Sequence, residues 1–282
     1  MFTNKLLQWL QLNEVRGKYA IYRLGLKLGF GRRLIQHKIK GKDFYVPWDQ
    51  WCFWLEYGPA NYYPEDIKPL AGVIQQFKGS SCLLDLGADI GTVSAQLDSQ
   101  CPLDKIIALE PNPNSFKILQ KNAESIGFLP LNFAISDFNG LVNLNFNTGL
   151  GSDHEGYIDK NVPGSTQVVT IDHLYAAYAL YEYKNIVIKI DVEGQEVAAL
   201  AGAKSLLKQC ENVVIMVEIH PDVLKRENIT AEDIFIEAEK HREFTWFVPS
   251  QSNQVIDRNT PFFKQFTTHQ YDVIGIAAPL TT

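Results

Sequence analysis

The sequence has few cysteines and no long apolar run. Only four of its 282 residues are cysteine and none forms a CxxC pair, which argues against a zinc site and favours a reducing compartment. Cys82 and Cys101 lie in or beside apolar runs and are expected to be buried thiols. No stretch approaches the ~18 apolar residues of a membrane-spanning helix. The first residues lack the cleavage site of a signal peptide, so we expect a cytoplasmic protein.

Acidic residues are almost absent from the N-terminal region. Residues 1–42 hold ten lysines or arginines and one acid, Glu14, for a net charge of +9, whereas the remaining 240 residues sum to −15. A basic arm on an acidic body indicates an anionic partner, such as a membrane surface that it touches peripherally, a phosphorylated substrate, or the body itself. A solvated helix face explains the charge equally well. The acidic body and the lack of an NPPY-like tetrapeptide for a flipped base argue against a nucleic acid partner.

From residue 81 onward, apolar strands alternate with amphipathic helices. Continuous apolar runs such as CLLDL and VVIMVEI predict strands covered on both faces, and hence a parallel sheet between helices. The alternation predicts a doubly wound α/β fold. Strands are expected at 82–86, 105–109, 131–135, 186–190 and 213–219. Helices are expected at about 91–101, 113–126, 194–208 and 230–241.

The two ends of the chain depart from this alternation. Near the C-terminus, 244–249 and 272–278 predict two strands with no helix between them, so one strand should run antiparallel. Residues 1–38 have a helical spacing of apolar side chains, which glycines weaken in the second half. We therefore expect an N-terminal basic, aromatic-rich extension over 1–64 and a main domain over 65–282.

A cluster of aromatic side chains lies within the predicted extension, at Trp48, Trp51, Trp54 and Tyr57. It could form a wall on which a sugar stacks, or a hydrophobic seam that packs the arm onto the core, and the seam is favoured slightly. Further along, 139–146 predicts a small hairpin opened by Asn-Gly. The polar segment 147–167 is longer than an ordinary connection and indicates a lid or a binding loop.

The motif LLDLGADIG, residues 83–91, joins the first strand to a helix. A dinucleotide-binding turn has three glycines as GxGxxG, so that pyrophosphate can approach the backbone. Here only Gly87 and Gly91 are present, with acids at Asp85 and Asp89. Acids disfavour pyrophosphate and favour a cation, and S-adenosylmethionine carries an ammonium and a sulfonium. The motif therefore favours this methyl donor, with an NAD-type Rossmann oxidoreductase as the alternative.

The next two strands also end in polar residues. Glu110 ends the second strand, 19 residues after Gly91, where an acid can accept hydrogen bonds from both hydroxyls of an adenosine ribose. The third strand brings Ser136 to the same edge of the sheet, where an adenine ring could lie. Asp137 could accept from the adenine amino group, although turn chemistry explains this residue nearly as well.

The fourth and fifth strands supply candidate catalytic groups. Lys189 and Asp191 share one face of a buried strand, and a buried charge such as Lys189 needs partners. Asp191 and Glu193 lie at the carboxyl end of this strand, beside the place where ligands bind. Glu218 and His220 share a face at the end of the fifth strand. A histidine there is suited to proton removal near neutral pH, or serves as a hydrogen-bonded structural residue.

Together these motifs resemble the FkbM family of S-adenosylmethionine-dependent methyltransferases. The resemblance runs from about Tyr63 to Pro221 and is carried by LLDLGADIG, ALEPNPNSF, NFAISDFNG, VVTIDHL and IKIDVEGQEVAALAGA. It implies the class I methyltransferase fold, a Rossmann-like and mostly parallel sheet of seven strands. It also implies O-methylation of a small-molecule or glycan acceptor, often a sugar or a polyketide-type product. The family usually has Asn where this chain has Asp89.

The resemblance also implies roles for individual residues. Asp85, Gly87, Ala88 and Gly91 would line the methionine end of the donor, Glu110 would hold the ribose, Ser136 would lie by the adenine, and Asp191 and Glu193 near the methyl group. The predicted donor-binding residues are then Asp85, Gly87, Ala88, Asp89, Gly91, Glu110, Pro111, Ser136, Asp137 and Asp191. The predicted catalytic residues are His220, Asp191, Glu193, Glu218 and Lys189.

The reaction needs an aligned acceptor oxygen and a group that removes its proton. We expect His220 or Asp191 to be the base, with Glu193 and Glu218 orienting it or the acceptor. A divalent metal held by Asp191 and Glu193 is the less favoured alternative to metal-free catalysis. A binding protein that docks on membranes through residues 1–42 is the alternative to an enzyme.

Overall fold

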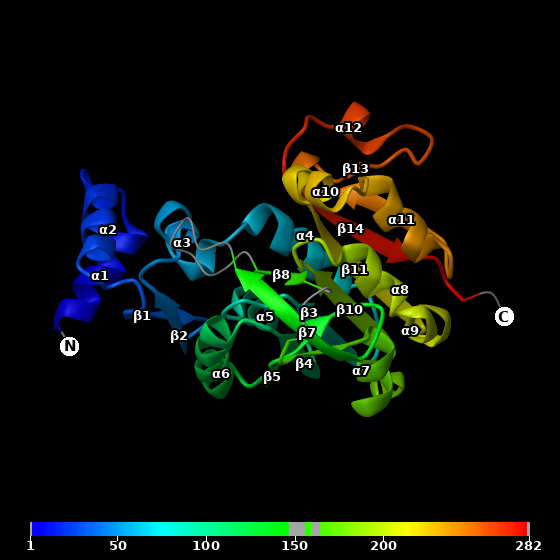
Figure 1. The fold of residues 1–282 in the computed structure, drawn as a ribbon, viewed down its shortest axis with the longest axis horizontal. Helices are drawn as coiled ribbons and strands as arrows, with labels where there is room; N and C mark the ends of the chain where they lie inside the picture. The colour runs from blue at the N-terminus through cyan, green and yellow to red at the C-terminus, as the bar shows by residue number, and fades with distance from the viewer. Residues whose placement is uncertain (1, 147–155, 160–163, 281–282) are drawn as a thin grey trace.

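A large mixed sheet forms the centre of the molecule in the computed structural model, which describes residues 2–146, 156–159 and 164–280 (Figure 1). Its strands are β3 (Ser81–Leu86), β4 (Lys105–Leu109), β5 (Leu129–Leu131), β10 (Asn185–Ile190), β11 (Asn212–Ile219), β12 (Phe244–Val248), β13 (Gln254–Val255) and β14 (Tyr271–Ala277). They lie in the order β13–β12–β14–β11–β10–β3–β4–β5. The pairs from β5 to β11 are parallel, and β14 runs antiparallel to both its neighbours.

This topology confirms the predicted doubly wound, Rossmann-like fold and its antiparallel closing strand. The short β13 adds an eighth strand, at the edge, to the seven expected. Between β12 and β14 the described chain has two short helical turns, η3 (Pro249–Gln251) and α12 (Phe262–Gln265). The carboxyl ends of the parallel strands therefore meet at one edge of the sheet, where the start of β14 also lies.

Helices cover both faces of the sheet. Along β3, Leu84 faces one buried layer and Leu83 the other, because successive side chains of a strand point to opposite faces. The first layer packs against α7 (Ile171–Ala177), α8 (Glu196–Ala201), α9 (Lys204–Gln209), α10 (Pro221–Glu227) and α11 (Ala231–Glu239). The second layer packs against α4 (Pro64–Ile74), α5 (Thr92–Gln100) and α6 (Pro113–Ile126). Two covered faces explain why the strands are apolar throughout.

Two predicted elements are interrupted. The strand expected at 131–135 ends at Leu131, and β6 (Ala134–Ile135) belongs to a different sheet, in which it pairs with β9 (Thr166–Val169). The helix expected at 194–208 divides into α8 and α9 around Gly202. A Cβ at Gly202 would lie 2.7 Å from the backbone oxygen of Ser136, which follows β6. The chain therefore packs closely on Ser136 at the point where the helix is interrupted.

The second sheet has four strands in the order β6–β9–β7–β8, with β7 at Gly140–Phe146 and β8 at Gly156–Asp159. The prediction of a hairpin within 139–146 is wrong, because this segment is one strand that pairs with both β8 and β9. The Asn139 side chain instead accepts a hydrogen bond from the backbone N–H of Thr170. Of the predicted loop 147–167, residues 147–155 and 160–163 lie outside the described residues.

The N-terminal region lies at one end of the molecule (Figure 1). It contains α1 (Phe2–Leu12), α2 (Lys18–Lys27), the hairpin of β1 (Leu34–Ile39) and β2 (Lys42–Pro47), α3 (Trp51–Leu55) and the turn η1 (Pro59–Asn61). Helical structure is confirmed for α1 and α2, whereas the stretch from residue 34 is a strand. Trp48 and Trp54 are buried together with Leu10 and Tyr22, so these two tryptophans pack within the extension itself, and not between the arm and the core as the predicted seam would.

The N-terminal hairpin also packs on the main body. Phe44 and Val46 of β2 belong to the buried layer that covers the second face of the sheet. A division between residues 64 and 65 stays a prediction. Among the described residues, no helix is both long enough and apolar enough to cross a bilayer. All four cysteines are free thiols, and Cys82 and Cys101 are buried as expected.

Candidate active site

Three cavities adjoin at the carboxyl ends of the parallel strands. The largest, of about 370 Å³, lies between the β3–α5 turn, the start of α4, the ends of β10 and β11, and the start of β14. A second, of about 330 Å³, extends past Trp51 to Glu193 and His220. A third, of about 60 Å³, lies against Glu110. Gly87 and Asp191 line all three cavities, so one ligand or two neighbouring ligands could occupy them together.

The β3–α5 turn packs tightly against the protein itself. Gly87 has a φ of 74°, and a Cβ on it would lie 1.7 Å from the backbone oxygen of Asp191. Gly91 has a φ of 86°, and a Cβ there would overlap side chains packed over the turn. The N–H groups of Gly87 and Ala88 both donate to the backbone oxygen of Leu109. These glycines are therefore required by contacts within the protein, rather than only by ligand approach.

Glu110 is held in place by backbone hydrogen bonds. Its carboxylate accepts from the N–H groups of Asp89, at 2.9 Å, and Asn112, at 2.7 Å. Glu110 is only 8% exposed, and it lines the smallest cavity and the second one. Burial, and then the nearby Asp89 carboxylate, raise the pKa of Glu110 to about 8. The carboxylate is thus fixed at the position that the sequence predicted for ribose recognition.

The smallest cavity has mostly apolar walls. Pro111, residues 133–135 and Gln195 line it. Ser136 lies behind it, fully buried, with its hydroxyl 3.1 Å from Oε1 of Gln195, and Asp137 is exposed. Gln195 was missed from the sequence, although its place in the turn after β10 was a signal. The predicted roles of Ser136 and Asp137 at an adenine ring stay predictions.

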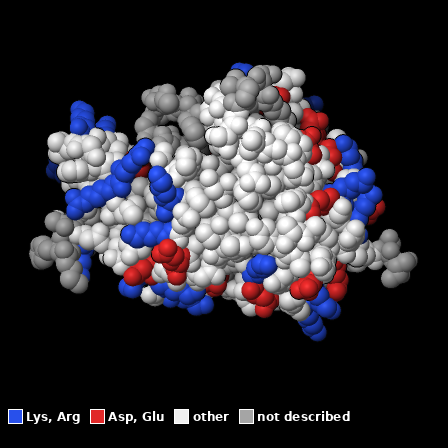
Figure 2. Space-filling view, turned by 60° about the horizontal axis from the view of Figure 1, so that its bottom comes forward, with Lys and Arg blue, Asp and Glu red and all other residues white. Residues whose placement is uncertain are grey.

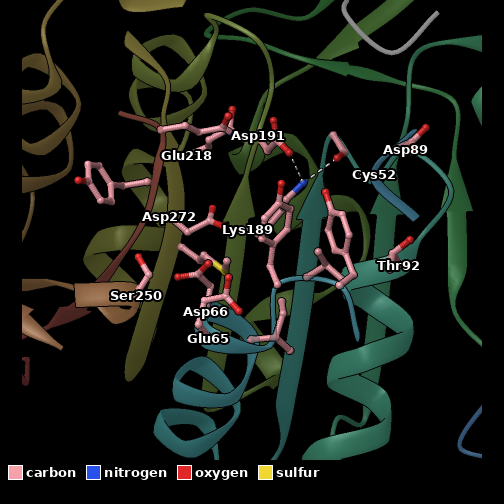
Figure 3. Close-up of a pocket in the computed structure, with 18 of the residues that line it drawn as sticks. Cys52, Glu65, Asp66, Asp89, Thr92, Lys189, Asp191, Glu218, Ser250 and Asp272 are labelled. Carbon is pink, nitrogen blue, oxygen red and sulfur yellow. Dashed lines mark hydrogen bonds and ion pairs between the residues drawn. The ribbon is translucent and has the colours of Figure 1, made fainter. Parts of the chain in front are cut away.

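Lys189 is a buried cation beneath the cavities (Figure 3). Its Nζ donates to the backbone oxygen of Gly87 at 2.7 Å and to Oδ2 of Asp191 at 3.0 Å, and it lies 3.7 Å from Oδ1 of Asp85. Burial by itself lowers the pKa of Lys189, but the Asp191 and Asp85 carboxylates outweigh it, so the net pKa lies above the usual value. The expected partners are confirmed, and the raised pKa favours the charged form of Lys189; its place among the catalytic residues stays a prediction.

The two acids of the glycine motif lie at different depths. Asp85 is fully buried, and its Oδ2 accepts from the backbone N–H and the hydroxyl of Ser94. It is not among the residues that line the three cavities, so its contact with a ligand stays a prediction. Asp89 lines the two larger cavities, and its Oδ2 accepts a hydrogen bond from the Gln50 side chain.

Carboxylates crowd the ends of β10 and β11 and the start of β14 (Figure 3). Asp191, Glu193 and Glu218 bring oxygens within 4.8 Å of one another. Burial, and then the Asp191 and Asp272 carboxylates, raise the pKa of Glu218 well above its usual range. Such oxygens suit a hard cation, but the ammonium of Lys189 already supplies a positive charge 3.0 Å from Asp191.

His220 follows β11 and precedes the first residue of α10. It lines the second cavity together with Asp191 and Glu218. Its Nδ1 is buried and has no hydrogen-bond partner among the described residues. A ring nitrogen in this position can accept a proton from a hydroxyl in the cavity.

The largest cavity also has wall residues that the sequence did not single out, among them Tyr62, Tyr63, Asp66 and Asp272. Asp272 had a signal, because an antiparallel strand over 272–278 must start at the edge where the parallel strands end. The other three come from the start of α4, and only the packing of this helix brings them to the site.

The sequence of this chain is similar to a known protein family and to a curated relative. Residues 85–246 match the sequence model of the methyltransferase FkbM domain. Hexuronic acid methyltransferase AglP of Haloferax volcanii is 28% identical over 153 residues, which cover 54% of this chain and 61% of that protein. The chain therefore matches about three fifths of the length of this curated relative.

Two solved structures are also similar. The crystal structure of methyltransferase FkbM from Methylobacillus flagellatus is 16% identical, with a TM-score of 0.44, over 71% of this chain and 44% of that one. That of TYW2 from P. horikoshii in complex with MeSAdo is 12% identical, with a TM-score of 0.43, over 89% of this chain and 73% of that one.

Proposed function

The chain belongs to the FkbM family of methyltransferases, and from this membership we propose that it transfers a methyl group from S-adenosylmethionine to a hydroxyl of a sugar or glycan acceptor. The observation that supports this most is the buried Glu110 carboxylate beside a narrow apolar cavity that meets a larger, carboxylate-lined cavity at Gly87 and Asp191. The name of the relative AglP, a hexuronic acid methyltransferase, supports a sugar-like acceptor.

The narrow cavity and its rim fit the nucleoside of the donor. Glu110, fixed by two backbone N–H groups, can accept hydrogen bonds from two ribose hydroxyls. Residues 133–135 and Gln195 offer apolar and amide surface to an adenine ring. Asp89 and Asp191 place negative charge where the cavities meet, which favours an ammonium and a sulfonium. When bound, S-adenosylmethionine supplies an electrophilic methyl group on a positively charged sulfur.

The acceptor hydroxyl must be aligned and must lose its proton. We assign proton removal to His220, whose Nδ1 has no other partner among the described residues, with Asp191 as the second candidate. Glu193 and Glu218 are placed to accept hydrogen bonds from the acceptor. Lys189 stays charged and holds the Asp191 carboxylate at the cavity. This route needs no metal ion.

Donor binding gives the first test. Glu110→Ala should weaken binding of S-adenosylhomocysteine by about ten-fold or more, because the hydrogen bonds to two ribose hydroxyls are lost. Isothermal calorimetry measures this affinity. Glu124→Ala, which removes an exposed acid from α6, is the matched control and should leave the affinity unchanged. Equal affinity in Glu110→Ala and the wild type would contradict the proposed donor site.

A further inference from the structure

The wall of the largest cavity that lies away from the β3–α5 turn is acidic. Asp66 of α4, Asp272 of β14 and Glu218 of β11 form it, with Glu65 beside them. Figure 3 shows these side chains gathered on one side of Lys189. Lys189 is the only lysine or arginine among the described residues that line this cavity, and it is already paired with other carboxylates.

Asp66 has a buried oxygen without a partner. The residue is 5% exposed, and its Oδ1 makes no hydrogen bond among the described residues. Burial, and then Glu65, raise the pKa of Asp66 to about 6. Burial, and then Asp66, raise the pKa of Asp272 to about 8. The backbone of Ser250 donates a hydrogen bond to this carboxylate of Asp66, so Oδ1 is the acceptor that is left, and a ligand that donates to this buried oxygen gains a strong interaction.

We propose that the acceptor carries a protonated amine in addition to the hydroxyl that is methylated, as an amino sugar does, and that Asp66 and Asp272 bind this amine. The inference rests on the proposed function and names the acceptor class. An ammonium has three N–H donors and a positive charge, so it satisfies Oδ1 of Asp66 and offsets the neighbouring acids. A neutral hydroxyl would supply the hydrogen bond but not the charge.

An anionic acceptor does not fit this wall. Above about pH 8, where both Asp66 and Asp272 are ionised, they would repel the carboxylate of a hexuronic acid, and no unpaired lysine or arginine among the described lining residues opposes that repulsion. Under the proposed function, the donor's positive charges lie by Asp89 and Asp191. The acceptor should therefore differ in charge from the acid named for the relative AglP.

Two of the three acids of this wall, Asp66 and Asp272, lie outside the segment that defines the family, whereas Glu218 lies within it. The family match covers residues 85–246, which include Glu110 and Asp191 but neither Asp66 nor Asp272. The proposed amine-binding pair therefore lies outside the part of the chain that the family model describes. Two aromatic rings of this region, Tyr62 and Tyr63, lie 4.5 Å apart and line the same cavity. They supply a surface on which a sugar ring can pack.

Three matched probes test the charge of the acceptor: the methyl glycosides of glucosamine, glucose and glucuronic acid. Their binding is measured by ligand-observed NMR titration in the presence of saturating S-adenosylhomocysteine. We expect the glucosaminide to bind about five-fold more tightly than the glucoside, as a charge-assisted hydrogen bond requires, and the glucuronide not to bind. Asp66→Asn should remove the preference. Asp222→Asn, which neutralises an exposed acid outside the cavity, should keep it.

The glucosaminide failing to bind, or binding no better than the other two glycosides, would overturn the inference.

A melting curve shows that the variant is folded. Because the pKa of Asp66 is raised to about 6, its ionisation costs stability as the pH rises through that value, so Asp66→Asn should melt no lower than the wild type at pH 8. Asp272→Asn is the second variant. If the wild type binds S-adenosylhomocysteine but does not prefer the glucosaminide, this inference alone is refuted. If the wild type does not bind S-adenosylhomocysteine at all, the proposed function is refuted.

Discussion

The carboxylates of the site are held in three different ways, and each way suits a different task. Glu110 accepts two backbone N–H groups, which fixes its direction. Asp191 contacts the ammonium of Lys189 on the floor of the cavity. Oδ1 of Asp66 has no hydrogen-bond partner among the described residues, and we propose that a ligand supplies one. In the sequence, all three residues are simply carboxylates. Only their hydrogen-bond and ion-pair partners in the fold distinguish the proposed recognition of a hydroxyl from the proposed recognition of a charge.

The side chain of His220 is the proposed base, and its removal should slow catalysis. His220→Ala should lower kcat for methyl transfer to the best glycoside acceptor by about 100-fold or more, as loss of a general base does, while affinity for S-adenosylhomocysteine stays unchanged. A coupled assay for S-adenosylhomocysteine release measures kcat. His173→Ala, an exposed histidine of α7, is the control.

Full activity of His220→Ala would refute the assignment of the base to His220 and would leave Asp191 as the candidate. Turnover should also persist in EDTA. Loss of activity in the chelator, with recovery on adding Mg²⁺, would instead indicate a metal on the group of Asp191, Glu193 and Glu218.

At the scale of elements, glycines mark where two segments touch. α2 continues through Gly25, although glycine weakens a helix, because the indole of Trp48 occupies the place of a side chain. A Cβ on Gly25 would lie 2.2 Å from this ring. The indole is buried and donates a hydrogen bond to the backbone oxygen of Tyr22, so it cannot move away without loss.

Replacement of two helical glycines should therefore have opposite effects. Gly25→Ala should lower the free energy of unfolding by about 1–3 kcal/mol, because the methyl group overpacks the contact with Trp48. Gly72→Ala in α4, where a Cβ would have no neighbour within 4 Å, should raise it by about 0.5–1 kcal/mol. Urea denaturation measures both. A stabilising Gly25→Ala would show that α2 does not pack on Trp48 as the structure has it.

Over the whole molecule, charge and apolar surface are unevenly distributed. Figure 2 shows lysine and arginine side chains gathered at the end of the molecule where α1 and α2 lie. The same two helices and the residue that follows α2 expose large apolar side chains, namely Leu6, Trp9, Leu12, Ile21, Leu24 and Leu28. Exposed leucine and tryptophan beside lysine and arginine form the surface of helices that lie on anionic membranes.

We expect this end of the molecule to bind vesicles that contain anionic lipid. The wild type should float with vesicles of phosphatidylcholine and phosphatidylglycerol and not with phosphatidylcholine alone, and high salt should weaken binding. The double change Trp9→Ser and Leu24→Ser should reduce binding by about ten-fold, because it removes apolar contacts with the bilayer. Flotation on a density gradient measures the bound fraction.

Ile236→Ser, in α11 of the main body, removes an equally exposed apolar side chain and is the matched control. Equal binding by the double variant and this control would contradict membrane docking through α1 and α2. A concentration-dependent dimer of the wild type that the double variant abolishes would instead assign the surface to a second copy of the chain.

Local sequence determined the parts of the protein that depend on short stretches of chain. Continuous apolar runs determined the strands β3, β4, β10 and β11, because only doubly covered strands can be apolar on both faces. The spacing of Glu110, Asp191 and Glu218 after those runs placed them at one edge of the sheet. Both follow from periodicity and from the parallel direction of the strands, which are local properties.

The tertiary structure decided what depends on contacts between distant segments. The structure divides the strand predicted at 131–135 and the helix predicted at 194–208. The sequence does not reveal these divisions, because the apolar pattern continues through both. Asp66 and Asp272 are more than 200 residues apart and form one wall only because α4 and β14 pack at the same edge. Their charges act on each other through space, so the chemistry of that wall exists only in the folded chain.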